Sequence, residues 1–436
     1  MTSLDLPAYR LTGFFPNDIF YNLSTLLTKV DLSRNRIEGL IPDLRNLTNL
    51  EGLDLSDNVL SGTIPESISY LSNLTDLQLS DNDLSGTIPE SIGYLSNLTD
   101  LQLSDNDLSG TIPESIGYLS NLEVFDLSKN SLSGTIPSSI DNLSKLERME
   151  LYNNSLIGTI PPSIGNLLNL VEIHLEINHL NGKIPSSIGN LSNLNLLIIN
   201  NNDLSGTIPN SIGYLSKINR LYLNNNDLSG TIPISFGDLS NLRDLFLSEN
   251  YLSGTIPKYI GNLSNIDLLI LNNNHLSGTI PESIGYLSSM RFLRLNNNHL
   301  SGTIPVSFGK LSNLEFLDLS FNMLVSVLPN EIGKLNSLQQ VFLQQNKLSG
   351  RIVDLTSPNL EVYDLRSNVF TGQIPSSLFA LISLKSLSVS DNCLSTDLSN
   401  IVDCHLSSSI EELFLVGIGI NTRYIITLNS FRSINR

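Results

Sequence analysis

An asparagine recurs every 24 residues through most of the chain, and this fixed period constrains the fold more than any other feature. Asn35 precedes the regular column by 23 residues, and Asn368 and Asn392 follow it at spacings of 22 and 24. The column itself consists of Asn58, Asn82, Asn106, Asn130, Asn154, Asn178, Asn202, Asn226, Asn250, Asn274, Asn298, Asn322 and Asn346. Such a period indicates one structural unit, here called a rung, that is stacked many times.

Two neighbouring rungs are almost identical. Residues 84–107 read LSGTIPESIGYLSNLTDLQLSDND, and residues 60–83 carry the same letters except that Ser69 stands in the position of Gly93. Because even the outward residues survive, duplication explains this stretch better than a shared chemical role does. Function is therefore expected in rungs that have diverged.

The residues around Asn106 predict how a rung begins. Leu101, Gln102 and Leu103 alternate, which predicts a short strand with both leucines inward and Gln102 outward. Each rung would add one such strand parallel to the last. Asn106 carries both an acceptor and donors, so it is predicted to satisfy the backbone groups that the strand releases at the turn.

The rest of the rung predicts a second extended segment and a return turn. In Ser-Gly-Thr-Ile-Pro, Gly86 permits unusual backbone angles and Pro89 removes a donor. Residues 90–98 return by an irregular or helical turn with their apolar residues inward. One rung buries too little to fold alone, so stability must come from stacking, and both ends need caps.

The full unit, L-x-x-L-x-x-L-x-L-x-x-N-x-L-S-G-x-I-P-x-x-I-G-x-L, resembles the plant-type leucine-rich repeats of extracellular receptor kinases, receptor-like proteins and polygalacturonase inhibitors. Ser-Gly-x-Ile-Pro distinguishes this class from shorter or helix-backed repeats. The resemblance implies an α/β solenoid: a right-handed superhelix with a concave parallel β-sheet, a short second β-segment, and 3-10, irregular or helical turns on the convex side. We expect one domain over residues 1–436, with frayed repeats at 1–34, regular repeats at 35–392 and a degenerate repeat or cap at 393–436.

Such families begin with a signal peptide and a cap that contains paired cysteines and tryptophan. This chain has no tryptophan, its cysteines lie late, and Met1 stands where an upstream rung is expected. We therefore expect a piece of a longer extracellular or cell-surface protein.

The charge and hydropathy of the chain exclude several classes of partner. Lys and Arg number 24 against 42 Asp and Glu, and a net charge of −18 repels nucleic acid and anionic lipid. The most apolar late stretch, residues 413–428, is 16 residues long and contains Arg423, so no transmembrane segment is expected.

In the resembling family, ligands bind mainly on the strand face. The outward residue four before the asparagine is apolar in four consecutive rungs, and charged and apolar residues border these four. At a strand spacing of about 4.8 Å the four would extend over about 15 Å as an exposed apolar patch. The alternative is that scattered surface apolar residues carry no function. The predicted ligand-binding residues are Ile198, Tyr222, Phe246, Ile270, Leu196, Arg220, Leu268, Phe292, Arg294 and Phe316.

The residue five after the asparagine is threonine in ten of twelve rungs; the exceptions are Lys183 and Val327. A flat hydroxyl array of this kind is used by some ice-binding proteins. The alternative is that threonine is simply a good strand former that duplication has copied. The column is Thr63, Thr87, Thr111, Thr135, Thr159, Thr207, Thr231, Thr255, Thr279 and Thr303.

Eight Asn-x-Ser/Thr sequons are expected to accept glycans if the chain is secreted, although Asn-Leu-Ser also belongs to the repeated unit. Cys393 and Cys404 are the only cysteines, and either a local disulfide or a pair of buried thiols fits them. The sequons lie at Asn22, Asn46, Asn73, Asn97, Asn142, Asn153, Asn190 and Asn262.

The sequence carries no phosphate-binding glycine loop, kinase signature or metalloprotease helix, so we expect no enzyme, catalytic residue or cofactor. His275 and His299 share a position in neighbouring rungs, but no carboxylate or thiol recurs there to complete a metal site.

The favoured function is a recognition ectodomain of the plant receptor-like class that binds a peptide or microbial ligand, with a possible co-receptor. The alternatives are a secreted polygalacturonase-inhibitor-like wall protein and an ice-binding protein that uses the threonine column.

Overall fold

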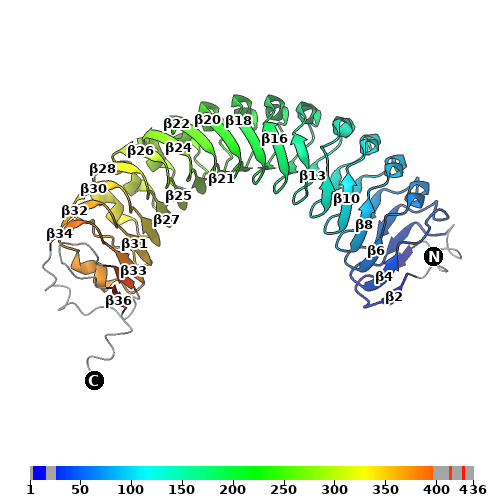
Figure 1. Ribbon diagram of the computed structural model, residues 1–436, viewed down its shortest axis with the longest axis horizontal. Coiled ribbons are helices and arrows are strands. Elements are labelled where there is room, and N and C mark those ends of the chain that lie inside the picture. Colours follow the sequence, from blue (N-terminus) through cyan, green and yellow to red (C-terminus); the bar gives the residue numbers. More distant parts are fainter. Residues whose placement is uncertain (1–2, 16–25, 396–411, 415–424, 428–436) are drawn as a thin grey trace, which may run out of the picture. The chain divides into compact units, whose positions relative to one another are not determined.

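The computed structural model describes residues 3–15, 26–395, 412–414 and 425–427. The chain forms two compact units, Met1–Asp227 and Leu228–Arg436. Both are built from the same coil, which contains a first strand of three residues, a second strand and a five-residue 3-10 helix. Figure 1 shows this repetition, with the strands of successive coils side by side within each unit.

In the first unit, the first strands form one parallel sheet and the second strands form two parallel ribbons. The first strands are β1 (Ser3–Asp5), β3 (Lys29–Asp31), β5 (Gly52–Asp54), β7 (Asp76–Gln78), β9 (Asp100–Gln102), β11 (Val124–Asp126), β13 (Arg148–Glu150), β15 (Glu172–His174), β17 (Leu196–Ile198) and β19 (Arg220–Tyr222). The second strands are β2 (Thr12–Phe14), β4 (Arg36–Leu40), β6 (Val59–Gly62), β8 (Asp83–Thr87), β10 (Asp107–Thr111), β12 (Ser131–Ser133), β14 (Ile157–Thr159), β16 (His179–Lys183) and β18 (Asp203–Thr207). The 3-10 helices are η1 (Glu66–Tyr70), η2 (Glu90–Tyr94), η3 (Glu114–Tyr118), η4 (Ser138–Asn142), η5 (Pro162–Asn166), η6 (Ser186–Asn190) and η7 (Asn210–Tyr214).

The second unit repeats this arrangement, and β36 closes its first-strand sheet antiparallel to β35. The first-strand sheet contains β21 (Asp244–Phe246), β23 (Leu268–Ile270), β25 (Phe292–Arg294), β27 (Phe316–Asp318), β29 (Gln340–Phe342), β31 (Val362–Asp364), β33 (Ser386–Ser388), β35 (Glu412–Phe414) and β36 (Ile425–Thr427). The second strands are β20 (Asp227–Thr231), β22 (Tyr251–Thr255), β24 (His275–Thr279), β26 (His299–Gly302), β28 (Met323–Val327), β30 (Lys347–Gly350), β32 (Val369–Gly372) and β34 (Cys393–Leu394). The 3-10 helices are η8 (Ile234–Asp238), η9 (Lys258–Asn262), η10 (Glu282–Tyr286), η11 (Val306–Lys310), η12 (Asn330–Lys334) and η13 (Ser376–Ala380).

Most of the described return turns are 3-10 helices, because the segment between the proline and the next leucine is too short for a stable α-helix. Pro89 is the N-cap of η2, and the backbone N–H of Leu95 closes the helix on the carbonyl of Ile92. Ile92, Leu95 and Leu98 are fully buried, as the sequence pattern predicted.

The asparagine column forms the predicted ladder of hydrogen bonds. Asn106 is buried, and its Oδ1 accepts a hydrogen bond from the backbone N–H of Leu84 at 2.9 Å. Its Nδ2 donates to the carbonyls of Leu79 at 3.0 Å, Leu103 at 3.2 Å and Ser104 at 3.1 Å. One side chain thus links its own turn to the preceding rung.

The glycine and threonine of Ser-Gly-Thr-Ile-Pro interlock between rungs. Gly86 has φ of +78°, which glycine adopts at little cost. A Cβ on Gly86 would lie 2.7 Å from Cγ2 of Thr63, so the threonine methyl fills the space that the glycine leaves. The same contact joins Gly110 to Thr87. The threonine column therefore has a packing role within the second strands.

Gly93 in η2 lies tightly against η3, because a Cβ on Gly93 would overlap the backbone oxygen of Ser115. Replacing Gly93 by alanine is expected to lower the free energy of unfolding by about 2 kcal/mol, since the two rungs must move apart. Ser69 occupies the same position one rung earlier, where a Cβ is already accommodated. Ser69→Ala is therefore the control, with an expected change within about 0.5 kcal/mol. Equal urea midpoints for the two variants would contradict the packing argument.

Candidate functional site

The first-strand face of the first unit ends in two apolar rungs. Strands β17 and β19 pair with Leu196 opposite Arg220 and Ile198 opposite Tyr222. Leu196, Ile198 and Tyr222 are half-buried, and Arg220 is exposed. These four residues, all predicted from the sequence as ligand-binding, lie together on adjacent strands.

Before these rungs, the same face of the first unit is acidic. Asp76 on β7 lies opposite Asp100 on β9, and Gln78 lies opposite Gln102. Burial raises the pKa of both aspartates, although the hydrogen bonds from Gln78 to Asp76 and from Gln102 to Asp100 oppose the shift. The duplicated rungs thus hold two carboxylates whose pKa values are raised by burial.

A cluster of charges surrounds His174 on β15. Its Nδ1 is 3.6 Å from Oε1 of Glu176, and its Nε2 is 4.0 Å from Oε2 of Glu172. Burial alone would lower the pKa of His174, but the hydrogen bond with Glu176 and the surrounding carboxylates outweigh it and raise this pKa. Burial and the charge of Asp126 raise the pKa of Glu150, which lies opposite His174.

These shifts predict that stability rises when the pH is lowered from 7.5 to 5. A group whose pKa is raised by folding binds a proton more readily in the folded chain, so its contribution to stability is lost as the pH rises through that raised value. His174 and Glu150 have the same sign as Asp76 and Asp100, so their contributions add. We expect a higher Tm at pH 5 than at pH 7.5 in a calorimetric scan.

The control for the pH effect is His174→Gln, which removes the group whose ordinary pKa, 6.5, lies between the two pH values. Its Tm is expected to change less between the two pH values. A Tm that falls on acidification to pH 5 in the unmodified protein would contradict the predicted sign.

The second unit carries the larger apolar face. Strand β25 pairs with β23 and β27, which places Phe292 opposite both Leu268 and Phe316. The Phe292 and Phe316 rings are stacked, with centroids 5.9 Å apart and planes 20° apart. Phe342 on β29 continues the row at 5.5 Å from Phe316. All three phenylalanines are half-buried, so their rings are partly open to solvent.

Arg294 lies across this aromatic row. Its guanidinium is 4.4 Å from the centroid of the Phe316 ring, a cation–π geometry. Asp318 lies opposite Arg294, and burial raises the pKa of Asp318 even though Ser320 donates two hydrogen bonds to it. The aromatic row and Arg294 together make a surface that is both apolar and cationic.

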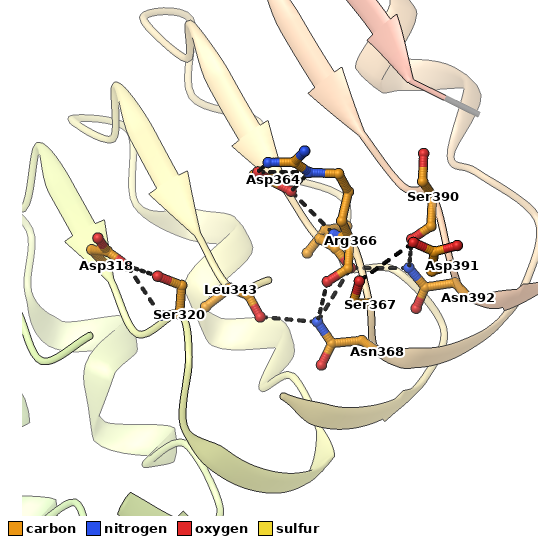
Figure 2. A network of polar contacts seen from close by, with 11 residues as sticks. Asp318, Ser320, Leu343, Asp364, Arg366, Ser367, Asn368, Ser390, Asp391 and Asn392 are labelled. Carbon is orange, nitrogen blue, oxygen red and sulfur yellow. Dashed lines mark hydrogen bonds and ion pairs between the residues drawn. The ribbon is translucent and has the colours of Figure 1, made fainter. Parts of the chain in front are cut away.

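Two ion pairs border this surface, one just before β23 and β25 and one on β31. Arg291 donates two hydrogen bonds to Asp267, at 2.8 and 2.7 Å. In the second pair, Arg366 lies 2.6 Å from Asp364. Figure 2 shows the Asp364–Arg366 pair, the Asp318–Ser320 contact and the amide of Asn368 donating to the carbonyl of Leu343. In each pair the arginine is already bonded to a carboxylate of this chain.

Ile270 departs from the expectation of an exposed patch, because its side chain is only 8% exposed. It lies between Phe246 and Arg294 on the neighbouring strands, and these longer side chains stand in register with it. Phe246 and Leu268 are half-buried and Arg294 is exposed. The binding role of the predicted residues stays a prediction.

Phe342 is missing from the predicted binding residues. It occupies an outward strand position, four before Asn346, and this position is the one feature of the sequence that could have identified it as part of the site. Phe316 lies directly opposite Gln340, so Phe316 and Phe342 are diagonal neighbours on adjacent strands. The repeat pattern does not show that their rings are large enough to touch across this diagonal.

The remaining predicted sites are placed as follows. Seven sequon asparagines are exposed: Asn46, Asn73, Asn97, Asn142, Asn153, Asn190 and Asn262. Asn22 and Cys404 lie outside the described residues, and Cys393 is exposed, so the disulfide stays a prediction. The threonine column is exposed along the second strands.

His275 and His299 stack with centroids 5.8 Å apart and planes 6° apart. No group of three metal-binding side chains is found among the described residues. Within the same ranges, no helix has both the length and the apolar character that a membrane crossing requires.

Two family models match the chain. Both are described as leucine-rich repeat; one matches residues 25–84, 96–156 and 288–348, and the other matches residues 169–191, 193–215, 217–239, 241–263 and 265–287. Receptor-like protein kinase 7 from Arabidopsis thaliana is 42% identical over 67 residues, which is 15% of this chain and 7% of that protein.

Solved plant receptors share the fold over most of the chain. The plant peptide hormone receptor RGFR1, in complex with RGF2, matches with a TM-score of 0.83 and 34% identity, over 94% of this chain and 74% of that one. A TDR receptor matches with a TM-score of 0.86 and 35% identity, over 90% of this chain and 68% of that one. The Arabidopsis receptor kinase HAESA, in complex with the peptide hormone IDA and the co-receptor SERK1, matches with a TM-score of 0.80 and 33% identity. The match covers 95% of this chain and 74% of that one.

Proposed function

The chain belongs to the leucine-rich-repeat family, and on that premise we propose that it is a non-catalytic recognition module, the ligand-binding ectodomain of a plant receptor-like protein or receptor kinase. It acts outside the cell or at its surface. Two of the similar solved ectodomains hold peptide hormones, which supports a peptide as the ligand.

The observation that carries the proposal is the open aromatic row of Phe292, Phe316 and Phe342 with Arg294 across it. Aromatic residues, phenylalanine included, and arginine are enriched at protein interfaces relative to the rest of the surface. A peptide laid across the first strands would place apolar side chains on the rings and an acidic or carbonyl group against Arg294. Leu196, Ile198, Arg220 and Tyr222 form a smaller apolar face in the first unit.

A co-receptor is the second proposed partner, because the HAESA structure contains the co-receptor SERK1 as well as the peptide hormone IDA. The ligand and the co-receptor are separate proposals, since a peptide can bind the strand face without a second protein.

The test is selection of peptides from a random display library on the full chain, followed by a second selection on a Phe316→Ser variant. Peptides that bind the first protein and fail to bind the second support strand-face recognition. If every selected peptide binds both proteins equally, the proposal is wrong.

A further inference from the structure

Strand β28 presents apolar side chains where neighbouring second strands present polar ones. Residues 299–303 read His-Leu-Ser-Gly-Thr, whereas residues 323–327 read Met-Leu-Val-Ser-Val. The side chains of Met323, Val325 and Val327 are 43%, 39% and 54% exposed. Phe321, just before the strand, and Val306 on η11 are also exposed. We call these five residues, Val306, Phe321, Met323, Val325 and Val327, the apolar strip.

A cavity of about 540 Å³ opens at one end of the strip. Val306, Val327, Leu328 and Pro329 form its apolar wall, while Glu331 and Arg351 contribute charged groups. The rung that follows is two residues shorter, since Asn346 and Asn368 are 22 apart, and no 3-10 helix lies between η12 and η13 in residues 335–375. η12 therefore packs against η11 of the preceding rung but has no 3-10 helix beside it in the following rung. The cavity is large enough for a side chain.

This rung also departs from the repeat in its backbone, because Ser326 occupies a left-handed conformation that is strained for a residue with a side chain. Ser326 has φ of +72°, where Gly302 and Gly350 occupy the equivalent positions at +75° and +77°. A residue with a Cβ pays about 1 kcal/mol in this region. The rung keeps the backbone path of the glycine rungs while it exchanges polar side chains for apolar ones.

Two cations lie along one side of the strip, in the rung that follows it, on an otherwise acidic protein. Strand β30 pairs with β28 so that Lys347 lies opposite Val325. Arg351, in the same rung as Lys347, is exposed at the cavity. Glu331 also lines the cavity, so Lys347 and Arg351 leave this surface with a small net positive charge, in contrast to −18 for the whole chain. A partner with acidic groups between apolar ones is complementary to this surface.

The sequons leave this part of the surface without glycan acceptors. The last Asn-x-Ser/Thr in the sequence is at Asn262, and the strip begins more than 40 residues later, at Val306. Glycans attached at the earlier sequons would be carried by other rungs.

We propose that the apolar strip and its cavity dock an acidic, amphipathic segment of another protein. One apolar side chain of that segment enters the cavity, others cover Met323 and Val325, and its carboxylates pair with Lys347 and Arg351. This surface lies on the second strands, so the proposal does not depend on ligand binding at the first strands. A lipid surface fits less well, because the strip is one strand wide and the net charge repels anionic lipid.

The test uses the full chain and three synthetic peptides labelled for fluorescence anisotropy. The first alternates leucine or phenylalanine with glutamate or aspartate, the second replaces every acidic residue by lysine, and the third replaces every apolar residue by serine. We expect the first peptide to bind at least 10-fold more tightly than either of the others. Equal affinities for the three peptides would overturn the proposal.

The matched variant copies the neighbouring rung into the strip: Met323→His, Val325→Ser, Ser326→Gly and Val327→Thr. His-Leu-Ser-Gly-Thr already folds at residues 299–303, and Ser326→Gly relieves a positive φ, so we expect Tm to be unchanged or higher. Its affinity for the acidic peptide is expected to fall at least 10-fold, and Arg351→Gln should weaken binding in part. Retained peptide affinity in the four-residue variant would refute the site.

Vesicles of phosphatidylcholine and phosphatidylglycerol test whether the strip binds a membrane instead of a protein segment. We expect no vesicle binding by the full chain. Binding that the four-residue variant abolishes, in the absence of peptide binding, would assign the strip to membranes instead.

Discussion

Replacing Asn106 by alanine is expected to lower the free energy of unfolding by about 3 kcal/mol. The substitution removes the acceptor of the Leu84 N–H and the donor for the carbonyls of Leu79 and Leu103. These backbone groups are buried, so water cannot replace the lost amide, and each unsatisfied group costs about 1 to 3 kcal/mol. The measurement is urea unfolding followed by circular dichroism.

Two controls separate the ladder from the general effect of a substitution. Asp107→Ala changes the exposed neighbour and should alter stability by less than about 0.5 kcal/mol. Asn106→Asp keeps an acceptor and loses both donors, so it should also destabilise. Since a solenoid can open rung by rung, hydrogen exchange of the Leu84 amide, which loses its acceptor, should report a local loss first, before that of the Leu108 amide, which bonds to Asn130. If Asn106→Ala were as stable as Asp107→Ala, the ladder would not hold the rungs together.

Replacing Phe316 by serine is expected to weaken the binding of a strand-face peptide by 10-fold to 100-fold, which corresponds to about 1.4 to 2.7 kcal/mol. Phe316 is the residue that Phe292, Phe342 and Arg294 all contact, so its loss disrupts the whole aromatic row. The ring is half-buried on an open face, and the leucines beneath it are unchanged, so the fold should persist. The measurement is titration calorimetry with a peptide selected on the unmodified chain.

Tyr286→Ser is a matched control for Phe316→Ser. Tyr286 is an exposed aromatic residue on η10, and Lys310 lies 4.4 Å from its ring centroid, the same separation as between Arg294 and the Phe316 ring. It therefore removes an aromatic ring and a cation–π contact away from the first strands. Its peptide affinity should equal that of the unmodified protein. An equal loss in both variants would show that the peptide does not depend on the first-strand face.

The fold was predictable because its periodicity is so regular. An apolar residue, usually leucine, at each inward position and an asparagine at each turn indicate the same rung throughout. The hydrogen bonds of Asn106 confirm the role inferred from its donors and acceptor. The pattern did not reveal that the residue before each asparagine has a positive φ angle. Ile177 and Phe321 both have positive φ there, at +56° and +51°, although bulky residues rarely adopt this region. Stacking of neighbouring rungs imposes that geometry, and single-residue preference does not predict it.

The candidate site was predicted only in part, because periodicity assigns a face but not how far each side chain is covered. Ile270 was expected on open surface and is buried, since Phe246 and Arg294 stand beside it. Phe342 was not selected and yet completes the aromatic row. Both differences come from side-chain sizes on neighbouring strands, which a repeat consensus does not contain.

Hydroxyl-radical footprinting of the full chain, with and without a selected peptide, tests strand-face recognition most directly. Aromatic side chains react readily, and the exposed tyrosines Tyr94, Tyr118 and Tyr214 on the 3-10 helices serve as internal references. We expect peptide-dependent protection of Phe292, Phe316 and Phe342, and unchanged reactivity of the tyrosines. Protection of the tyrosines without protection of the three phenylalanines would contradict recognition on the first-strand face.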